Sequence, residues 1–191
     1  KNVDGEIHVR SHDSNEFKVY YQVIQKNEIL DVDRNELNAL AKTYMSLETN
    51  MKGNQLEILV KRNWRNNFGR FKKPITVDIY VYAPVKTRSE LSSSDGNISI
   101  NGLENAQFVK TSDGDIQIKN ITGDMVAKTS DGDVKMEEVT GNAELRTSDG
   151  DIEVADHQGN LEAKTSDGDI EIADHQGNLE ARTSDGDVEL D

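Results

Sequence analysis

One phrase, Thr-Ser-Asp-Gly-Asp-Ile/Val, recurs with small variations through the last hundred residues at a period of 18 residues. Its glycine falls at a constant interval, at Gly96, Gly114, Gly132, Gly150, Gly168 and Gly186. A fixed repeat of this length is typical of solenoids, in which each unit packs only on its neighbours. The repeat therefore predicts a rod of stacked units whose surface carries columns of equivalent side chains.

Each unit consists of two half-units of nine residues that alternate apolar and polar side chains. In residues 147–164, the alternation places Ile152 and Val154 inward in the first half and Leu161 and Ala163 inward in the second. A period of two is typical of a strand with one buried face. We therefore predict an all-β fold, a parallel β-solenoid that is a right-handed single-stranded β-helix with 18 residues per coil and about six coils.

A second glycine column indicates the backbone conformation of the other turn. Its members are Gly123, Gly141, Gly159 and Gly177, and Asn105 occupies the first position. Because asparagine tolerates a left-handed backbone better than other non-glycine residues, the substitution predicts a positive φ at this turn.

The 191 residues divide into two continuous regions, an N-terminal β-rich region (1–91) and the repeats (92–191). Residues 2–9 echo the repeat phrase, with Gly5 at the glycine position, and predict an early coil or an edge of the same sheet. Further strands are expected near residues 16–25, 55–62 and 75–82. One amphipathic helix is predicted at about 34–46 from a capping-box-like start and helical spacing of apolar residues, and we expect it to cover the solenoid.

Charge is distributed unevenly between the two regions. Residues 1–91 carry 15 basic and 12 acidic side chains, whereas residues 92–191 carry 7 and 24, so the net charges are +3 and −17. Such an acidic solenoid argues against nucleic-acid binding through the repeats. The absence of cysteine excludes a disulfide scaffold, and no stretch approaches 18 apolar residues. Because the chain starts at Lys1 rather than Met, we expect that a leader or anchor has been removed.

Residues 61–73 differ from the rest of the chain in containing six basic residues, three aromatic residues and no acid. The favoured interpretation is a hairpin whose aromatic side chains turn inward. The other is a patch for an anionic partner, such as membrane headgroups, an acidic wall polymer or nucleic acid. The candidate partner-binding residues are Lys61, Arg62, Trp64, Arg65, Arg70, Lys72 and Lys73.

The paired aspartates of the repeat phrase suggest calcium as the ion to consider. Nine-residue half-units with Gly and Asp are similar to the β-roll repeats that bind calcium between turns. The candidate ligands are Asp131, Asp133, Asp149, Asp151, Asp167 and Asp169. The second half-unit lacks the extra glycines and aspartate of a β-roll, so capping of turn amides is the favoured role and no cofactor is expected.

Two histidines, His157 and His175, stand one period apart and are candidates for chelating a transition metal. The same column holds Ile121 and Val139, which favours a packing role at a corner. Catalysis is not expected, because each acidic residue of the solenoid has near-copies one coil away and a catalytic pair needs groups in different environments.

Several segments occur in an order that resembles a known family. They are VDGEIHV (3–9), ELNALA (36–41), GNQLEILV (53–60), PITVDIYVYAP (74–84) and SSSDGNISINGL (92–103), followed by tandem KTSDGDI units. The order is similar to that of the bacterial putative-adhesin family, cell-envelope β-strand-repeat proteins of unknown biochemical role. The resemblance implies a β-helical fold in a secreted, surface-exposed or membrane-anchored setting. It implies no catalytic or binding residues, because none are established for the family.

These observations together predict a non-enzymatic cell-envelope or surface protein. Its leading role is that of an adhesin or structural scaffold that binds an envelope component through repeated columns. One alternative is an envelope sensing or regulatory module that binds an anionic membrane or protein partner through residues 61–73. Another is a calcium-binding repeat protein. The expected location is extracellular or in the cell envelope, with peripheral or anchored membrane association.

Overall fold

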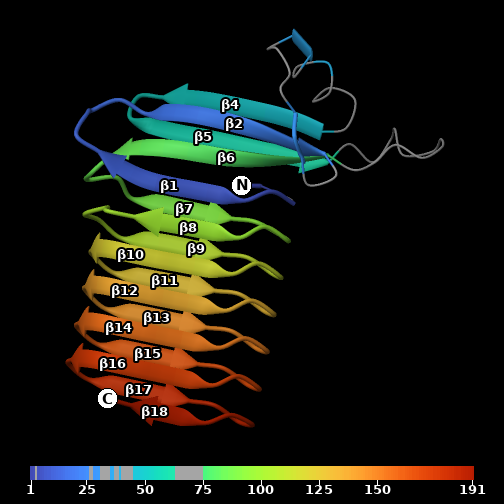
Figure 1. Cartoon of the computed structure of the whole chain (residues 1–191). Coiled ribbons are helices and arrows are strands. Elements are labelled where there is room, and N and C mark those ends of the chain that lie inside the picture. Colours follow the sequence, from blue (N-terminus) through green and yellow to red (C-terminus); the bar gives the residue numbers. More distant parts are fainter. Residues whose placement is uncertain (3, 26–27, 31–34, 37–38, 40–44, 63–74) are drawn as a thin grey trace, which may run out of the picture.

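The computed structural model describes the chain except residues 3, 26–27, 31–34, 37–38, 40–44 and 63–74. The strands stack into a rod with the C-terminus at one end (Figure 1). Their bounds are β1 Ile7–His12, β2 Lys18–Gln25, β3 Glu28–Ile29, β4 Met45–Lys52, β5 Gln55–Arg62, β6 Ile75–Pro84, β7 Ser89–Ser92, β8 Ile98–Asn101, β9 Gln107–Lys110, β10 Ile116–Thr122, β11 Met125–Lys128, β12 Val134–Thr140, β13 Ala143–Arg146, β14 Ile152–Gln158, β15 Leu161–Lys164, β16 Ile170–Gln176, β17 Leu179–Arg182 and β18 Val188–Leu190.

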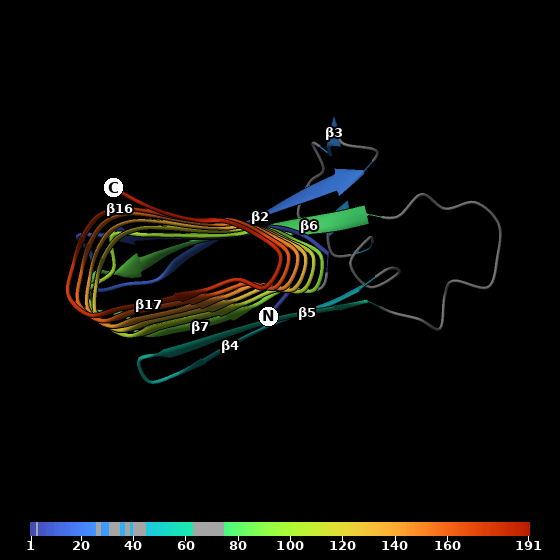
Figure 2. The ribbon, with the colours of Figure 1, turned by 90° about the horizontal axis from the view of Figure 1, so that it is seen from below.

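Each coil contributes one strand to each of two facing sheets. A ten-stranded sheet has the order β18-β16-β14-β12-β10-β8-β1-β6-β2-β3, and a six-stranded sheet has the order β17-β15-β13-β11-β9-β7. Viewed along the rod, the two sheets enclose a narrow core (Figure 2). The predicted all-β parallel solenoid is confirmed, because neighbouring coils pair in parallel one period apart, as Ile152 does with Ile170.

The core consists of the inward columns that the alternation predicted. Ile152, Val154, Leu161 and Ala163 are all buried, while Glu153 between them is exposed. The column that contains Ile152 stays buried through the repeats and becomes exposed only at Val188 in the last coil. Burying the same positions in each coil produces one apolar spine, and each buried aliphatic side chain stabilises the fold by roughly 1.5–3 kcal/mol.

The early coil predicted at residues 2–9 is confirmed. Strand β1 lies between β6 and β8 and pairs in parallel with both, so Ile7 aligns with Ile98 in the apolar column. Gly5 also stacks directly against Gly96, and the contact is so close that a Cβ at Gly96 would overlap the Gly5 carbonyl oxygen. The same overlap recurs at each later glycine of the phrase, so close stacking of turns excludes any side chain there.

Threonine side chains bind the turns together inside the rod. The Thr147 hydroxyl lies 3.1 Å from the Ser130 carbonyl oxygen and 2.9 Å from that of Gly132, both in the preceding coil. It also accepts a hydrogen bond from the Gly150 N–H at 3.3 Å. Equivalent bonds to the preceding coil recur at Thr111, Thr129, Thr165 and Thr183.

Positive φ angles occur in two columns, of which the sequence indicated one. Gly123, Gly141, Gly159 and Gly177 have φ between 143° and 147°, as predicted, whereas Asn105, the residue that suggested it, does not have a positive φ. The second column comprises Gly102, Asn120, Glu138, Asp156 and Asp174, with φ from 53° to 79°. The left-handed residue, Glu138 in β12, bends the strand. Val139 therefore points inward, as Met136 does, although the two residues are three apart and strict alternation would place them on opposite faces.

A hairpin of β4 and β5 covers the N-terminal end of the rod on the side of the six-stranded sheet (Figure 2). Its Val60 packs with Val23, Ile75, Val77 and Ile79 in a second core. The backbone N–H of Val60 donates to the Lys1 carbonyl at 2.9 Å. The hairpin therefore covers this part of the rod, whereas the covering role predicted for a helix stays a prediction.

The predicted strands at 16–25, 55–62 and 75–82 correspond to β2, β5 and β6. Most of the helix predicted at about 34–46 lies outside the described residues. Its last two residues belong to β4, so this end of the prediction is wrong. Strand β4 escaped the sequence analysis because Leu47 fits both the helical spacing and the alternation of Met45–Lys52.

Candidate functional surfaces

The turn formed by the repeat phrase, such as that between β13 and β14, carries two columns of aspartates, both exposed. In one column the carboxylate caps the next coil: Asp133 Oδ1 accepts from the Asp151 N–H at 2.9 Å, and Asp151 Oδ1 accepts from the Asp169 N–H at 2.8 Å. The amide-capping role predicted for the aspartates is confirmed for this column. A similar bond occurs in the N-terminal region, where Asp78 Oδ1 on β6 accepts from the Glu6 N–H at 2.9 Å.

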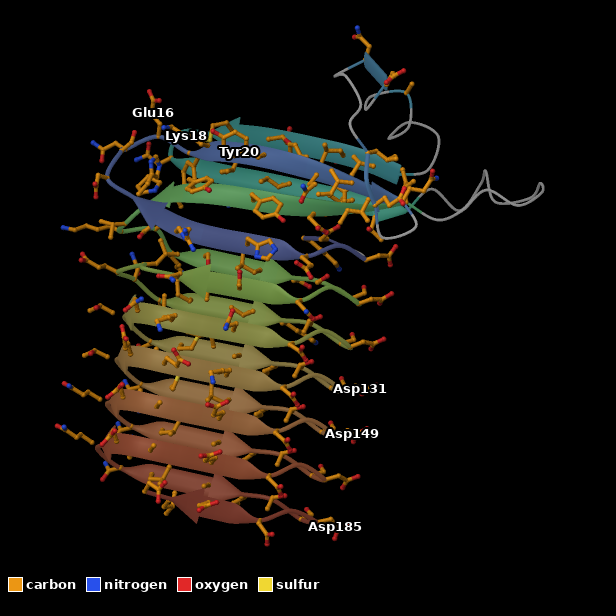
Figure 3. All side chains as sticks on the ribbon, in the orientation of Figure 1. Glu16, Lys18, Tyr20, Asp131, Asp149 and Asp185 are labelled. Atoms are coloured by element: carbon orange, nitrogen blue, oxygen red, sulfur yellow. The ribbon has the colours of Figure 1, made fainter. Side chains whose placement is uncertain are left out.

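The other column, which contains Asp131, Asp149 and Asp167, projects away from the rod. Figure 3 shows Asp131, Asp149 and Asp185 extending outward along one edge. Their backbone N–H groups donate to the turn of the preceding coil, as that of Asp149 does to the Ser130 carbonyl oxygen at 2.9 Å. Among the described residues, no three acidic, histidine or cysteine side chains converge in a geometry that could hold a metal ion. Calcium binding by the six candidate aspartates stays a prediction.

Ion pairs link neighbouring coils on the outer faces. Lys119 Nζ lies 2.8 Å from a Glu137 carboxylate oxygen, Lys135 Nζ lies 2.6 Å from one of Glu153, and Lys164 Nζ lies 2.8 Å from one of Glu180. The Glu137 pKa is lowered, first by its bond to Lys119 and then by that to Lys135. Each of these exposed pairs contributes little to stability by itself, and together they offset part of the repulsion within each charge column.

His157 and His175 stack inside the rod in the column of Ile121 and Val139. Their rings are nearly parallel, at 5°, with centroids 5.1 Å apart and the two Nδ1 atoms 3.0 Å apart. His157 is fully buried. The packing role is therefore confirmed, and the pair is joined by no third ligand among the described residues.

Hydrogen bonding assigns the tautomers of this pair. The His157 Nε2 lies 2.9 Å from the Gly141 carbonyl oxygen, so it must carry the hydrogen. In the neutral ring Nδ1 is then an acceptor, which His175 satisfies by donating from its own Nδ1. The remaining nitrogen, His175 Nε2, is buried without a partner in the described structure. Burial is the main cause that lowers the pKa of His157, and charge on His175 lowers it further.

The basic segment 61–73 lies almost entirely outside the described residues. Lys61 is exposed on β5, and Arg62 ends that strand. The candidates Trp64, Arg65, Arg70, Lys72 and Lys73 lie outside the described residues, so their role stays a prediction.

A group of aromatic residues on the outer face of β1, β6 and β2 was missed by the sequence analysis. Tyr20 contacts Tyr82 edge to face at a centroid distance of 5.8 Å, and His12 contacts Tyr82 at 6.4 Å. Tyr80 stacks on His8 at 4.6 Å. The available signal was the placement of two tyrosines at outward positions of an alternating strand. We call the residues Tyr20, Tyr80 and Tyr82 the tyrosine face.

Two parallel sheets that each receive one strand per coil define the chain as a β-solenoid repeat protein. The Toastrack DUF4097 family matches residues 2–191, so the chain belongs to this family. The crystal structure of a putative adhesin from Bacteroides fragilis NCTC 9343 is similar, with a TM-score of 0.55, 16% identity, and coverage of 99% of this chain and 91% of that chain. The resemblance drawn from the order of segments is thereby confirmed. The curated proteins gave no match.

Within the described part of the chain, no helix has the length and apolar character needed to cross a bilayer.

Proposed function

We propose that the protein is a non-enzymatic surface or envelope component, an adhesin or structural scaffold that binds through the columns of its rod. The observation that carries the proposal is the exact one-coil register of the outer side chains. Glu153 pairs with Glu171 and Glu162 with Glu180, so each outward group is presented again one coil further on. Binding to such a surface sums weak contacts over several coils.

The likeness of the rod to the fold of a protein described as a putative adhesin supports this role. The equivalence of the turn aspartates supports the non-enzymatic part, because Asp133, Asp151 and Asp169 make the same hydrogen bond in successive coils. A catalytic carboxylate needs an environment that distinguishes it from its neighbours.

The experiment changes the number of coils without changing the surface of any coil. Removing residues 147–164 joins Arg146 to Thr165 in register, and duplicating the same residues adds one coil. We expect binding to immobilised cell envelopes to weaken with the deletion and to strengthen with the duplication by a similar factor. Far-UV circular dichroism checks that both variants fold.

Identical binding by the shortened, natural and lengthened rods would contradict binding through repeated columns. Turnover of an acidic polysaccharide that disappears on substitution of one carboxylate would contradict the non-enzymatic role.

A further inference from the structure

We propose that the tyrosine face, together with Lys18 and Arg10, is a binding site for an acidic polysaccharide chain. The proposal goes beyond binding through the columns of the rod, because this site belongs to β1, β2 and β6, outside the repeats. It rests on three observations: exposed aromatic rings, a comparison with equivalent positions of the same sheet, and flanking positive charge.

The rings are exposed and held in place. Tyr20 is 56% exposed and Tyr82 is 37% exposed. Tyr82 is fixed between Tyr20 and His12 by edge-to-face contacts, and the Tyr80 hydroxyl donates to Gln22 Oε1 at 3.1 Å. Figure 3 shows Tyr20 and Lys18 at the same end of the rod. Rigid tyrosines bind partners at little entropic cost, and their faces accept the C–H groups of a pyranose ring.

The fold does not require tyrosine at these positions. Tyr20, Tyr80 and His8 lie in one row across the ten-stranded sheet, and the row continues through small, polar or charged residues. Those residues are Ser99, Gln117, Lys135, Glu153 and Glu171. Since equivalent strands pair equally well without aromatic side chains, exposing Tyr20 and Tyr82 beside the half-buried Tyr80 indicates a ligand rather than a packing need.

The charge beside the rings indicates an acidic ligand. Lys18 and Arg10 are the register partners of Tyr82 on either side, so the backbone of a basic residue lies about 5 Å from that of the tyrosine in each neighbouring strand. Both are exposed, and neither has an acidic partner within the described residues, whereas Lys119, Lys135 and Lys164 in the repeats are bridged by glutamates. A sugar ring stacked on Tyr82 would place its carboxylate within reach of either cation.

Negative charge elsewhere on the rod leaves this assignment intact. The acidic turns of the repeats begin at Asp95, two strands from β6, each strand adding about 4.8 Å, and the screening length at physiological salt is about 8 Å. Closer carboxylates also lie beside this face: Glu6 and Asp78 act on Tyr80, with Glu6 paired to His8, and Glu16 lies near Lys18 (Figure 3). Lys18 and Arg10 are nevertheless the residues that flank Tyr82 itself in the two neighbouring strands. The acidic repeats confine a polyanionic chain to the N-terminal end of the rod.

Titration calorimetry of the whole chain with polygalacturonate oligosaccharides tests the site, and the fully methyl-esterified oligosaccharide is the neutral ligand with the same backbone. We expect Tyr82→Ala to weaken binding to the acid form by at least about tenfold. The matched control is Phe108→Ala on the opposite sheet, because Phe108 is 38% exposed. We expect Lys18→Gln with Arg10→Gln to remove the preference for the acid form, and Lys110→Gln to leave it unchanged.

Equal affinity for the acid and ester forms, or binding that Tyr82→Ala leaves unchanged, would overturn the proposal. Loss of a dimer by Tyr82→Ala in sedimentation, without loss of an oligosaccharide affinity, would identify the face as a self-association surface and also overturn it. If Tyr82→Ala does not fold, the Lys18 and Arg10 substitutions decide the question. Deleting residues 147–164 should leave this affinity unchanged, which separates the site from binding through the columns.

Discussion

Replacing His157 and His175 by valine, the residue of the same column at Val139, should make the rod more resistant to acid. His157 is fully buried, and its pKa is lowered first by that burial, against the opposing effect of its bond to Gly141. The unfolded chain therefore takes up a proton on His157 as the pH falls through the ordinary histidine pKa of 6.5, whereas the folded chain takes it up only at lower pH.

The sign and size of the effect follow from this difference. Because the folded-state pKa is lowered, the stability is complete above pH 6.5 and is lost as the pH falls below it. At pH 5, an imidazole that stays neutral in the fold reduces the free energy of unfolding by up to about 2 kcal/mol relative to pH 8. At pH 8, the double variant removes the unpartnered His175 Nε2, whose burial costs about 1–3 kcal/mol, and it also loses the bond from His157 to the Gly141 carbonyl.

Urea unfolding at pH 8, 6.5 and 5, followed by circular dichroism, measures the free energies, and amide exchange locates the opening. In the natural protein we expect β14 and β16 to lose protection first on acidification. His12→Gln, a change on the N-terminal face, should keep the pH dependence of the natural protein. The reasoning is refuted if the double valine variant loses as much free energy between pH 8 and pH 5 as the natural protein.

Four further predictions concern single features. Glu138→Gly should raise the free energy of unfolding by about 1 kcal/mol, because φ at Glu138 is 55° and glycine occupies the same column at Gly102; no gain in urea unfolding would show that the left-handed bend is unstrained. Asp151→Ala should lower the free energy of unfolding by about 1 kcal/mol through loss of the hydrogen bond to the Asp169 N–H, while Asp149→Ala should change it little. Equal effects of the two substitutions would contradict the distinction between the aspartate column that caps amides and the one that does not. Thermal melting with calcium and with chelator tests the ion prediction, and a shift under about one degree would remove it. Replacing the six basic residues of 61–73 should weaken binding to anionic vesicles if this segment binds a membrane, and unchanged binding would contradict that alternative. The six residues are Lys61, Arg62, Arg65, Arg70, Lys72 and Lys73.

The repeat made most of the rod predictable from sequence. Because neighbouring coils pair one period apart, the alternation around Ile152 and Leu161 determines both the strands and the buried columns. Gly5 identified the first coil in the same way, since only glycine allows the turns to stack so closely. In each case a local rule and the global fold require the same residue.

The remaining features depend on information that a local pattern does not carry. Glutamate at position 138 by itself gives no sign of the left-handed bend that turns Val139 inward. The signal lies in the other members of its column, because Gly102 and Asn120 are residue types that tolerate a positive φ, and the sequence analysis did not use it. The bonding of His157 to Gly141 depends on the preceding coil. The tyrosine face required knowledge of which strands adjoin, because Tyr20 and Tyr82 are far apart in sequence and meet only through the pairing of β2 with β6.

The direction of the hydrogen bonds has a mechanical consequence. The bonds between coils, such as that from the Ile152 N–H to the Asp169 carbonyl, run along the rod, and the coils follow one another in chain order toward the end formed by β18 (Figure 1). A force that pulls this end away from the β4–β5 hairpin acts on the hydrogen bonds of one coil at a time instead of shearing those of a whole sheet. Each coil released would add about 60 Å of extended chain. The rod would therefore yield in equal steps and absorb tension by lengthening, while the capped end stays folded.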